Sequence, residues 1–117
     1  ERLYSEKMKI YNIEKIEILT PMDGFRGRMV HTRDLTIAFW EIDKNSILPL
    51  HKHINTQTSH VVSGKLELTI GGLTKVLNAG ELVVINSNEL HSGKALTPCY
   101  VIDTFSPPRK DYIQSRD

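Results

Sequence analysis

The chain has 117 residues, a length that suits one domain with a single hydrophobic core and excludes two. Its 15 basic and 14 acidic residues give a net charge of +1, so nothing in its charge favours a nucleic-acid partner. No apolar run approaches the roughly 18 residues of a membrane span, and the N-terminus lacks an apolar signal core. The single cysteine, Cys99, excludes an internal disulfide; we expect no chemistry from it and a cytoplasmic location for the protein.

The first twenty residues contain two short stretches, 8–13 and 16–19, in which apolar and polar residues alternate. Alternation with a period of two predicts strands. Since an arm of this kind can cover an open sheet edge, we expect it to extend a neighbouring copy's sheet in a homodimer. The single domain, 1–117, is therefore divided into an N-terminal arm at about 1–20, a barrel at about 21–106 and a polar C-terminal tail at 107–117.

The central part of the chain consists of short β-forming stretches separated by turns rich in glycine and asparagine. The stretch 35–42 alternates, so Thr36, Ala38 and Trp40 share one face of the predicted strand and Ile37 lies on the other. Short strands at this spacing are typical of an all-β sandwich or barrel. Further strands are predicted at 28–33, 47–53, 61–63, 65–70, 75–77, 80–85 and 100–105.

Three histidines and one glutamine give the strongest chemical signal in the sequence. His51 and His53 lie two residues apart on a predicted strand, so both imidazoles leave the same face, about 7 Å apart, and can reach one ion. Gln57 offers a neutral amide oxygen, and His91 adds a third imidazole. This neutral donor set suits a divalent transition metal better than magnesium or calcium. We expect one ion per chain, and nickel, zinc, iron, manganese and cobalt all remain open.

Written in order, these residues resemble the two signature motifs of the cupin superfamily. Glycines and asparagines at the expected spacings accompany the four predicted ligands. Asn45 and Asn88 replace glycines of the motifs, and asparagine tolerates the left-handed backbone conformation that those glycines supply. Asn86 replaces a proline and loses only rigidity. The matching patterns are His51-x-His53-x3-Gln57-x6-Gly64 and Gly80-x5-Asn86-x-Asn88-x2-His91.

The resemblance implies an all-β fold, the double-stranded β-helix or jelly-roll barrel of cupins, with the N-terminal strand arm in front of it. It also implies that the three histidines bind the metal. Gln57 either completes the ligand set or hydrogen-bonds one of the imidazole ligands, and both readings stay open. His60 either contacts a substrate or forms part of the barrel wall, and His31 is expected to be an exposed or edge residue without a role.

A second resemblance lies in the run from Asp103 to Arg109. Asp103 and Phe105 share one face of the last predicted strand, and a double proline then turns the chain before Arg109. This D-x-F-S-P-x-R run resembles the end of the small cupins of pectin and alginate breakdown, which convert 4,5-unsaturated uronates to their linear keto form. A glutamate that often precedes the motif glutamine in that group is Thr56 here.

This second resemblance implies the roles of the substrate-side residues. Arg109 binds a substrate carboxylate through its planar guanidinium, Phe105 contacts the substrate, and Asp103 transfers a proton. If these residues have no such roles, Asp103 and Arg109 instead form a simple surface salt bridge. Two other functions also stay open: a different metal-dependent cupin enzyme, such as a dioxygenase or a sugar isomerase, and a sugar-binding cupin without catalysis.

Overall fold

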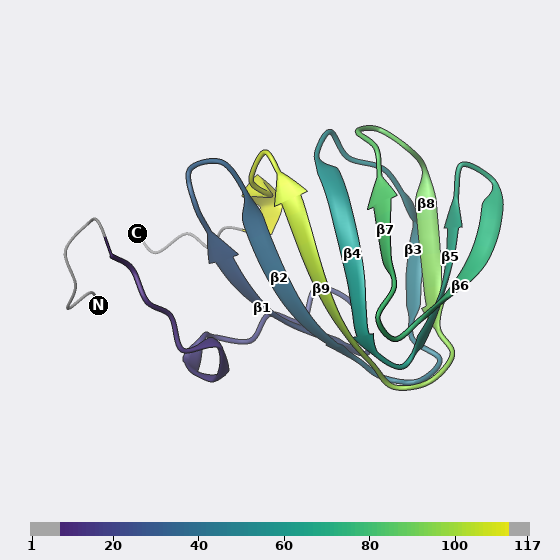
Figure 1. Cartoon of the computed structure of the whole chain (residues 1–117), viewed down its shortest axis with the longest axis horizontal. Helices are drawn as coiled ribbons and strands as arrows, with labels where there is room; N and C mark the ends of the chain where they lie inside the picture. The colour runs from purple at the N-terminus through teal and green to yellow at the C-terminus, as the bar shows by residue number, and fades with distance from the viewer. Residues whose placement is uncertain (1–7, 113–117) are drawn as a thin grey trace.

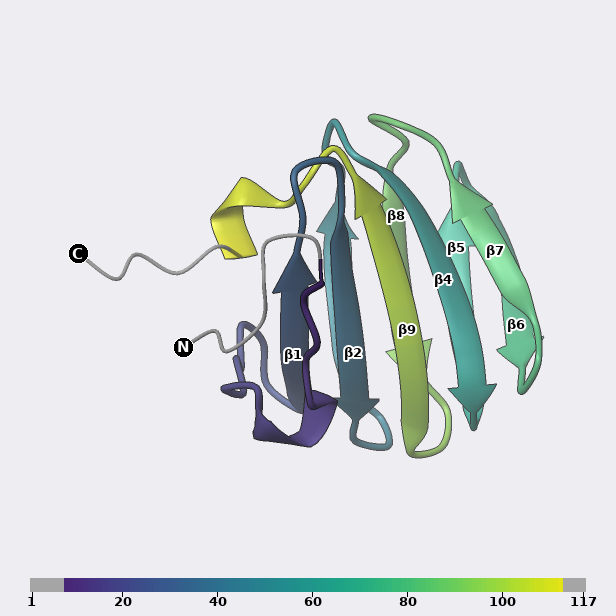
Figure 2. The same cartoon turned by 60° about the vertical axis from the view of Figure 1, so that its left-hand side comes forward.

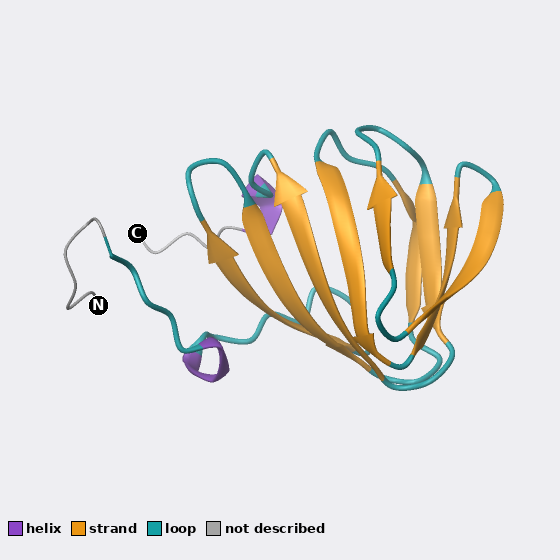
Figure 3. Cartoon of the chain, viewed as in Figure 1, coloured by secondary structure: helices purple, strands orange, loops and turns teal. Residues whose placement is uncertain are grey.

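The structure, a computed structural model, describes residues 8–112 (Figure 1). Strands dominate these residues, as the colouring of Figure 3 shows, and the all-β prediction is confirmed. No helix in the described part of the chain is long and apolar enough to cross a membrane. The elements are η1 (Ile13–Lys15), β1 (Phe25–His31), β2 (Thr36–Ile42), β3 (Ile47–His51), β4 (Thr56–Ser63), β5 (Lys65–Ile70), β6 (Leu73–Asn78), β7 (Leu82–Ile85), β8 (His91–Ala95), β9 (Cys99–Ser106) and η2 (Lys110–Tyr112).

The strands form two antiparallel sheets, in the arrangement of a jelly roll. The five-stranded sheet has the order β1-β2-β9-β4-β7, and the four-stranded sheet has the order β3-β8-β5-β6. Figure 2 shows them as two curved layers with the interior between them. The last strand of the chain, β9, occupies the middle of the larger sheet, between β2 and β4. Its inward-facing residues therefore lie at the centre of the barrel.

Alternation along the strands decides which side chains fill that interior. In β2, Thr36, Ala38 and Trp40 are buried while Ile37 is only half-buried, so the predicted faces are confirmed. Trp40 packs edge-on against Phe25, with ring centroids 5.8 Å apart. Each such buried apolar side chain contributes about 1.5–3 kcal/mol to the stability of the fold. The other buried apolar residues of the core are Met29, Ile42, Val61, Leu66, Leu68, Leu77, Ala95, Cys99, Val101 and Phe105.

Two asparagines adopt the left-handed backbone expected of them. Asn45 has a φ of 71° and Asn88 a φ of 64°, and the side chains of both residues are compatible with this region. Gly64 turns β4 into β5 with a φ of 92°. A Cβ at that position would lie 2.3 Å from the carbonyl oxygen of Pro98, so glycine is required there for space as well as for φ.

The prediction of strands in the N-terminal arm was wrong. The stretch 8–13 forms no strand, and the 3-10 turn η1 follows, stabilised by the Asn12 side chain, which accepts a hydrogen bond from the Glu14 backbone N–H at 3.1 Å. The stretch 16–19 makes one isolated bridge, between Leu19 and Gly27. Alternation gives a segment one apolar face, but a strand also needs a neighbour for its backbone hydrogen bonds.

Two strands of the smaller sheet also differ from the sequence prediction. β3 ends at His51, two residues earlier than predicted, because its pairing with β8 shifts register between Leu48 and His51. His53 therefore lies in a loop. β8 was not predicted, since Gly93 and Lys94 interrupt any apolar alternation in it.

Candidate active site

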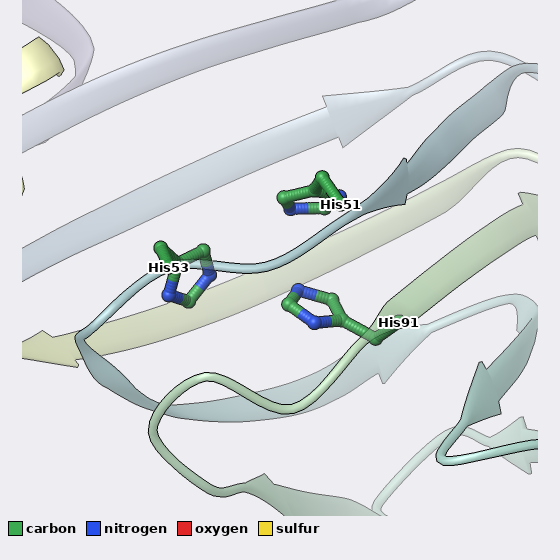
Figure 4. A group of neighbouring side chains, drawn as sticks. All are labelled: His51, His53 and His91. Atoms are coloured by element: carbon green, nitrogen blue, oxygen red, sulfur yellow. The ribbon is translucent and has the colours of Figure 1, made fainter.

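The three histidines of the predicted metal site converge at one end of the smaller sheet. His51 is the last residue of β3 and pairs directly with His91, the first residue of β8. His53 follows in the loop before β4, and the Asn88 backbone N–H donates a 2.7 Å hydrogen bond to its carbonyl oxygen. Figure 4 shows the three imidazoles pointing toward one another. Their ring centroids are 4.2 to 5.6 Å apart, and one nitrogen of each lies within 4.8 Å of the others.

Hydrogen bonds determine which nitrogen of each ring is free. In all three histidines Nδ1 bonds to a backbone carbonyl oxygen two residues away in the sequence. A carbonyl oxygen only accepts, so Nδ1 carries the proton and Nε2 keeps its lone pair for a ligand. The distances are 2.8 Å from His51 to Pro49, 3.1 Å from His53 to Asn55 and 2.8 Å from His91 to Glu89.

Gln57 faces the free nitrogen of His53 from the inner side of β4. Its Nε2 donates to the Ser59 hydroxyl at 2.9 Å, which directs Oε1 toward His53 Nε2 at 3.0 Å. With the proton on Nδ1, both of these atoms offer lone pairs that a cation between them can accept; with a proton on Nε2, the imidazole donates a hydrogen bond to Oε1 instead. Two ligands at right angles, each about 2.1 Å from an ion, are separated by about 3.0 Å. The donor set of this chain therefore fits a bound transition metal.

Two further observations agree with that fit. Nε2 of His91 is buried and has no hydrogen-bond partner among the described residues. Burial, reinforced by the positive charge of Arg109, lowers the pKa of both His53 and His91 below the ordinary histidine value. Neutral imidazole is the form that binds metals, so these rings are in the required state at neutral pH.

Asp103 lies on the inner face of β9, opposite Ser59 of β4. It is 8% exposed, and its Oδ1 has no hydrogen-bond partner among the described residues. Burial raises the pKa of its carboxyl to about 6, against the opposing effects of hydrogen bonds from Ser59 and Trp40 and of the charge on Arg109. Both protonation states are accessible near neutral pH, as a group that takes and returns protons requires.

Arg109 lies against two aromatic rings at the same end of the barrel. Its guanidinium carbon lies 4.7 Å from the ring centroid of Phe105 and 4.2 Å from that of Tyr112. Asp111 binds the guanidinium through two hydrogen bonds, from Nε at 2.9 Å and from Nη2 at 2.6 Å. The salt bridge of Arg109 is thus formed with Asp111 and not with Asp103.

Two buried polar residues that the sequence analysis missed hold the segment around Arg109. Thr36 accepts a hydrogen bond from the Arg109 backbone N–H at 3.0 Å, and its hydroxyl also lies 2.8 Å from Nδ1 of His31. Asn55 donates its amide to the carbonyl oxygens of Pro107 and Pro108, at 2.5 and 3.3 Å. No local pattern marks either residue, because their partners lie far along the chain.

The structure brings all but one of the predicted site residues together. His60 is the exception: it alternates with Gln57 and Ser59 along β4 and lies on the outer face of the sheet. The inner face borders a cavity between the two sheets, and Tyr112 covers part of it. The predicted site residues that line this cavity are His51, Gln57, His91, Asp103, Phe105 and Arg109.

Comparisons with known proteins agree with this architecture. The chain is 33% identical over 94 residues to the pectin degradation protein KdgF of Dickeya dadantii (strain 3937), over 78% of this chain and 86% of that protein. The structure of KdgF from Halomonas sp. is similar, with a TM-score of 0.84 and 27% identity over 91% of this chain and 99% of that one.

A crystal structure of an RmlC-like cupin from Shewanella frigidimarina NCIMB 400 matches with a TM-score of 0.81 and 31% identity, covering 86% of this chain and 91% of the other. Residues 38–105, which begin within β2 and end within β9, match the family described as a cupin domain. The predicted family and fold are therefore confirmed: the chain belongs to the cupin family.

Proposed function

We propose that this protein is a metal-dependent enzyme that opens the ring of 4,5-unsaturated uronates from pectin or alginate breakdown. The observation that carries the proposal is the pairing of a neutral metal-ligand set with a buried carboxyl, Asp103, and an arginine, Arg109, on one cavity. The similarity to a pectin degradation protein supports this class of substrate. One divalent transition metal is bound per chain through His51, His53, His91 and Gln57.

The reaction is an isomerisation that needs no co-reactant. A 4,5-unsaturated uronate is a cyclic hemiacetal whose ring oxygen is also an enol-ether oxygen. The anomeric hydroxyl loses its proton and becomes an aldehyde while the bond from C1 to the ring oxygen breaks. The electron pair passes to that oxygen as an enolate, and a proton added at C4 gives the linear keto acid. Catalysis therefore requires a proton acceptor, a proton donor and a stabiliser of the enolate.

Arg109 binds the carboxylate of the substrate. Its planar fork matches a carboxylate, and its contacts with Phe105 and Tyr112 restrain the fork at the cavity. Phe105, buried below it, gives the substrate an apolar wall that excludes water. This arrangement places the sugar ring, attached to the carboxylate, over the interior of the barrel.

Asp103 takes the proton of the anomeric hydroxyl and returns a proton to C4. Its pKa of about 6 lets a fraction of the enzyme act in either form near neutral pH. The bound metal supplies Lewis acidity that polarises oxygens of the substrate and favours the enolate. Ser59 and Trp40 hold the carboxyl in place, which limits its motion during transfer.

The test combines elemental analysis of the purified protein with an absorbance assay. The enol-ether carboxylate absorbs at about 230 nm, and ring opening removes that chromophore. We expect one equivalent of a divalent transition metal and loss of absorbance with unsaturated galacturonate or with the isomer derived from alginate. A fully metal-loaded protein that leaves both chromophores intact would rule out this reaction. Consumption of oxygen on a sugar acid would indicate a dioxygenase instead, and binding without turnover would indicate a sugar-binding protein.

The protein is also proposed to act as a homodimer. The N-terminal arm exposes apolar side chains, Met8, Ile10, Tyr11 and Ile18, that make little contact with the barrel. A second copy would cover them, by backbone pairing or by side-chain contact. Light scattering on the intact chain decides this, and a particle of about 13 kDa at working concentration would exclude the dimer.

A further inference from the structure

The guanidinium of Arg109 is restrained on three sides, and each restraint comes from a different neighbour. The rings of Phe105 and Tyr112 lie on two adjacent sides of the guanidinium, with centroids 4.7 and 4.2 Å from its carbon and 6.1 Å from each other. Asp111 binds along one edge through two charge-assisted hydrogen bonds. The function of Asp111 is not explained by the reaction proposed above, since its carboxylate neither lines the cavity nor touches the histidines.

The paired charges differ sharply in exposure. The side chain of Asp111 is 61% exposed, whereas that of Arg109 is 10% exposed. The carboxylate therefore lies at the rim, and the arginine lies inside, where it borders the cavity. The two hydrogen bonds use Nε and Nη2 and leave Nη1 outside the pairing. An incoming carboxylate can bind at Nη1 and at the remaining hydrogen of Nη2 without displacing Asp111.

We propose that Asp111 is a positioning residue that fixes the guanidinium of Arg109 with its free edge directed at the substrate carboxylate. This inference rests on the proposed function and deepens it. A long arginine side chain that is already ordered loses less conformational entropy when an anion binds. Asp111 thereby contributes to substrate affinity without touching the substrate.

The alternative is that Asp111 competes with the substrate for Arg109 and must leave before the substrate binds. Two observations favour positioning. The hydrogen bonds to Asp111 do not use Nη1, so departure of Asp111 is unnecessary for a carboxylate to bind there. The turn η2 is also anchored, because the ring centroid of Tyr112 lies 6.0 Å from that of Trp40 and 6.1 Å from that of Phe105.

The experiment measures binding separately from turnover. Saturated galacturonate carries the carboxylate but has no enol ether to react, so its affinity for the metal-loaded protein can be titrated by calorimetry. Its uncharged methyl ester is titrated beside it. Asp111→Asn removes the charge of the positioning residue, and Asp111→Glu retains it. Asp34→Asn is the matched control, because Asp34 is 76% exposed, lies in the β1–β2 turn and carries the same charge.

We expect Asp111→Asn to weaken galacturonate binding about 5- to 10-fold, with the ester little affected, so that the preference for the acid falls. Asp111→Glu should recover part of this loss, and Asp34→Asn should stay within about twofold of wild type. In turnover, the change should appear in KM and not in kcat. The melting temperature of Asp111→Asn should match that of wild type, which separates positioning from a merely structural role.

Unchanged galacturonate affinity in Asp111→Asn, with wild type binding normally, would overturn the inference while the proposed function stands. Tighter binding in that variant would also overturn it and identify Asp111 as a competitor. A metal-loaded wild type that neither binds galacturonate nor opens the unsaturated uronates would overturn the proposed function, and the positioning role with it.

Discussion

The two halves of the candidate site are held in place in different ways. Each histidine of the metal half is oriented by a backbone carbonyl only two residues away in its own segment. The substrate half depends on partners far along the chain: Arg109 on Thr36, 73 residues away, and Pro107 on Asn55, 52 residues away. Local restraints orient the metal ligands. On the substrate side, long-range contacts hold the backbone around Arg109, and its guanidinium is then restrained by the nearby Phe105, Asp111 and Tyr112.

This difference has a consequence for how each half responds to mutation. A backbone carbonyl cannot be removed by substitution, so the free Nε2 of each histidine is maintained by the loop itself. The groups around Arg109 are side chains, and each of them can be changed separately. We therefore expect the metal half to fail only when a ligand is lost, and the substrate half to weaken in steps.

The largest effect is expected from removing two metal ligands. The double substitution His51→Ala and His53→Ala should reduce bound metal from one equivalent to none and abolish turnover, since one imidazole and one amide remain. The domain should still fold, because neither side chain belongs to the apolar core. Elemental analysis and circular dichroism measure the two outcomes. His60→Ala, on the outer face, is the control and should keep its metal; a double variant that retained one equivalent would contradict the assigned ligands.

The next largest effect is expected from Asp103→Asn. The amide keeps the shape of the side chain but cannot shuttle a proton, so kcat should fall by about 10²- to 10⁴-fold with KM little changed. Steady-state rates with unsaturated galacturonate, at confirmed metal content, provide the measurement. If Asp103→Asn turns over as fast as wild type, the proton is carried by another group and the role given to Asp103 is wrong.

A smaller effect is expected from Arg109→Lys. Lysine keeps the positive charge but loses the planar fork and its contacts with the rings of Phe105 and Tyr112. KM should rise by about 10- to 100-fold, which corresponds to roughly 1.5–3 kcal/mol of lost charge-assisted bonding, while kcat changes little. The same kinetic assay separates the two constants. A fall in kcat at unchanged KM would place Arg109 in the chemical step and not in substrate binding.

The last effect concerns stability and pH in the metal-free protein. The pKa of Asp103 is raised from 3.8 to about 6, so folding favours its protonated form. That contribution is fully present below about pH 3.8 and is lost as the pH rises through 6, because the folded state binds more protons than the unfolded state in this interval. Full ionisation costs at most about 3 kcal/mol.

Asp103→Asn cannot ionise, so its stability relative to wild type should grow from pH 4 to pH 7, by up to about 3 kcal/mol at the upper end. Urea unfolding at several pH values measures this difference. Bound metal favours the carboxylate, so the difference should shrink in the loaded protein. A difference that stays constant across this range would show that the carboxyl titrates normally.

The same contrast explains what the sequence could reveal about the molecule. The spacing of His51, His53, Gln57 and His91 predicted a convergent set of donors, and the structure brings them together. The set is visible because the four residues match the spacing of a family motif; the strand period assumed for His51 and His53 does not hold, since His53 lies in a loop after β3. The barrel itself was also predictable, since the faces of β2 and the left-handed Asn45 and Asn88 are local features.

Other features could not be predicted because they depend on contacts between residues that are far apart in the sequence. Nothing near Thr36 or Asn55 in the sequence marks them as structural residues. Their partners belong to the segment after β9, which contains the double proline. The outward direction of His60 depends on where β4 begins, and a shift of one residue reverses it. In the N-terminal arm the sequence predicted strands that the structure lacks. The alternation there is regular, but the arm pairs with the rest of the described chain only through the bridge between Leu19 and Gly27.

The central position of β9 also affects how the protein is made. During synthesis on a ribosome, β1, β2 and β4 emerge before β9, the strand that joins them. Until then the larger sheet remains as two separate pieces whose inner edges lack partners, and these edges are open to association with other chains. A chain that stopped shortly before Cys99 would therefore be inactive. Its larger sheet would remain in two pieces, and proteases would degrade it.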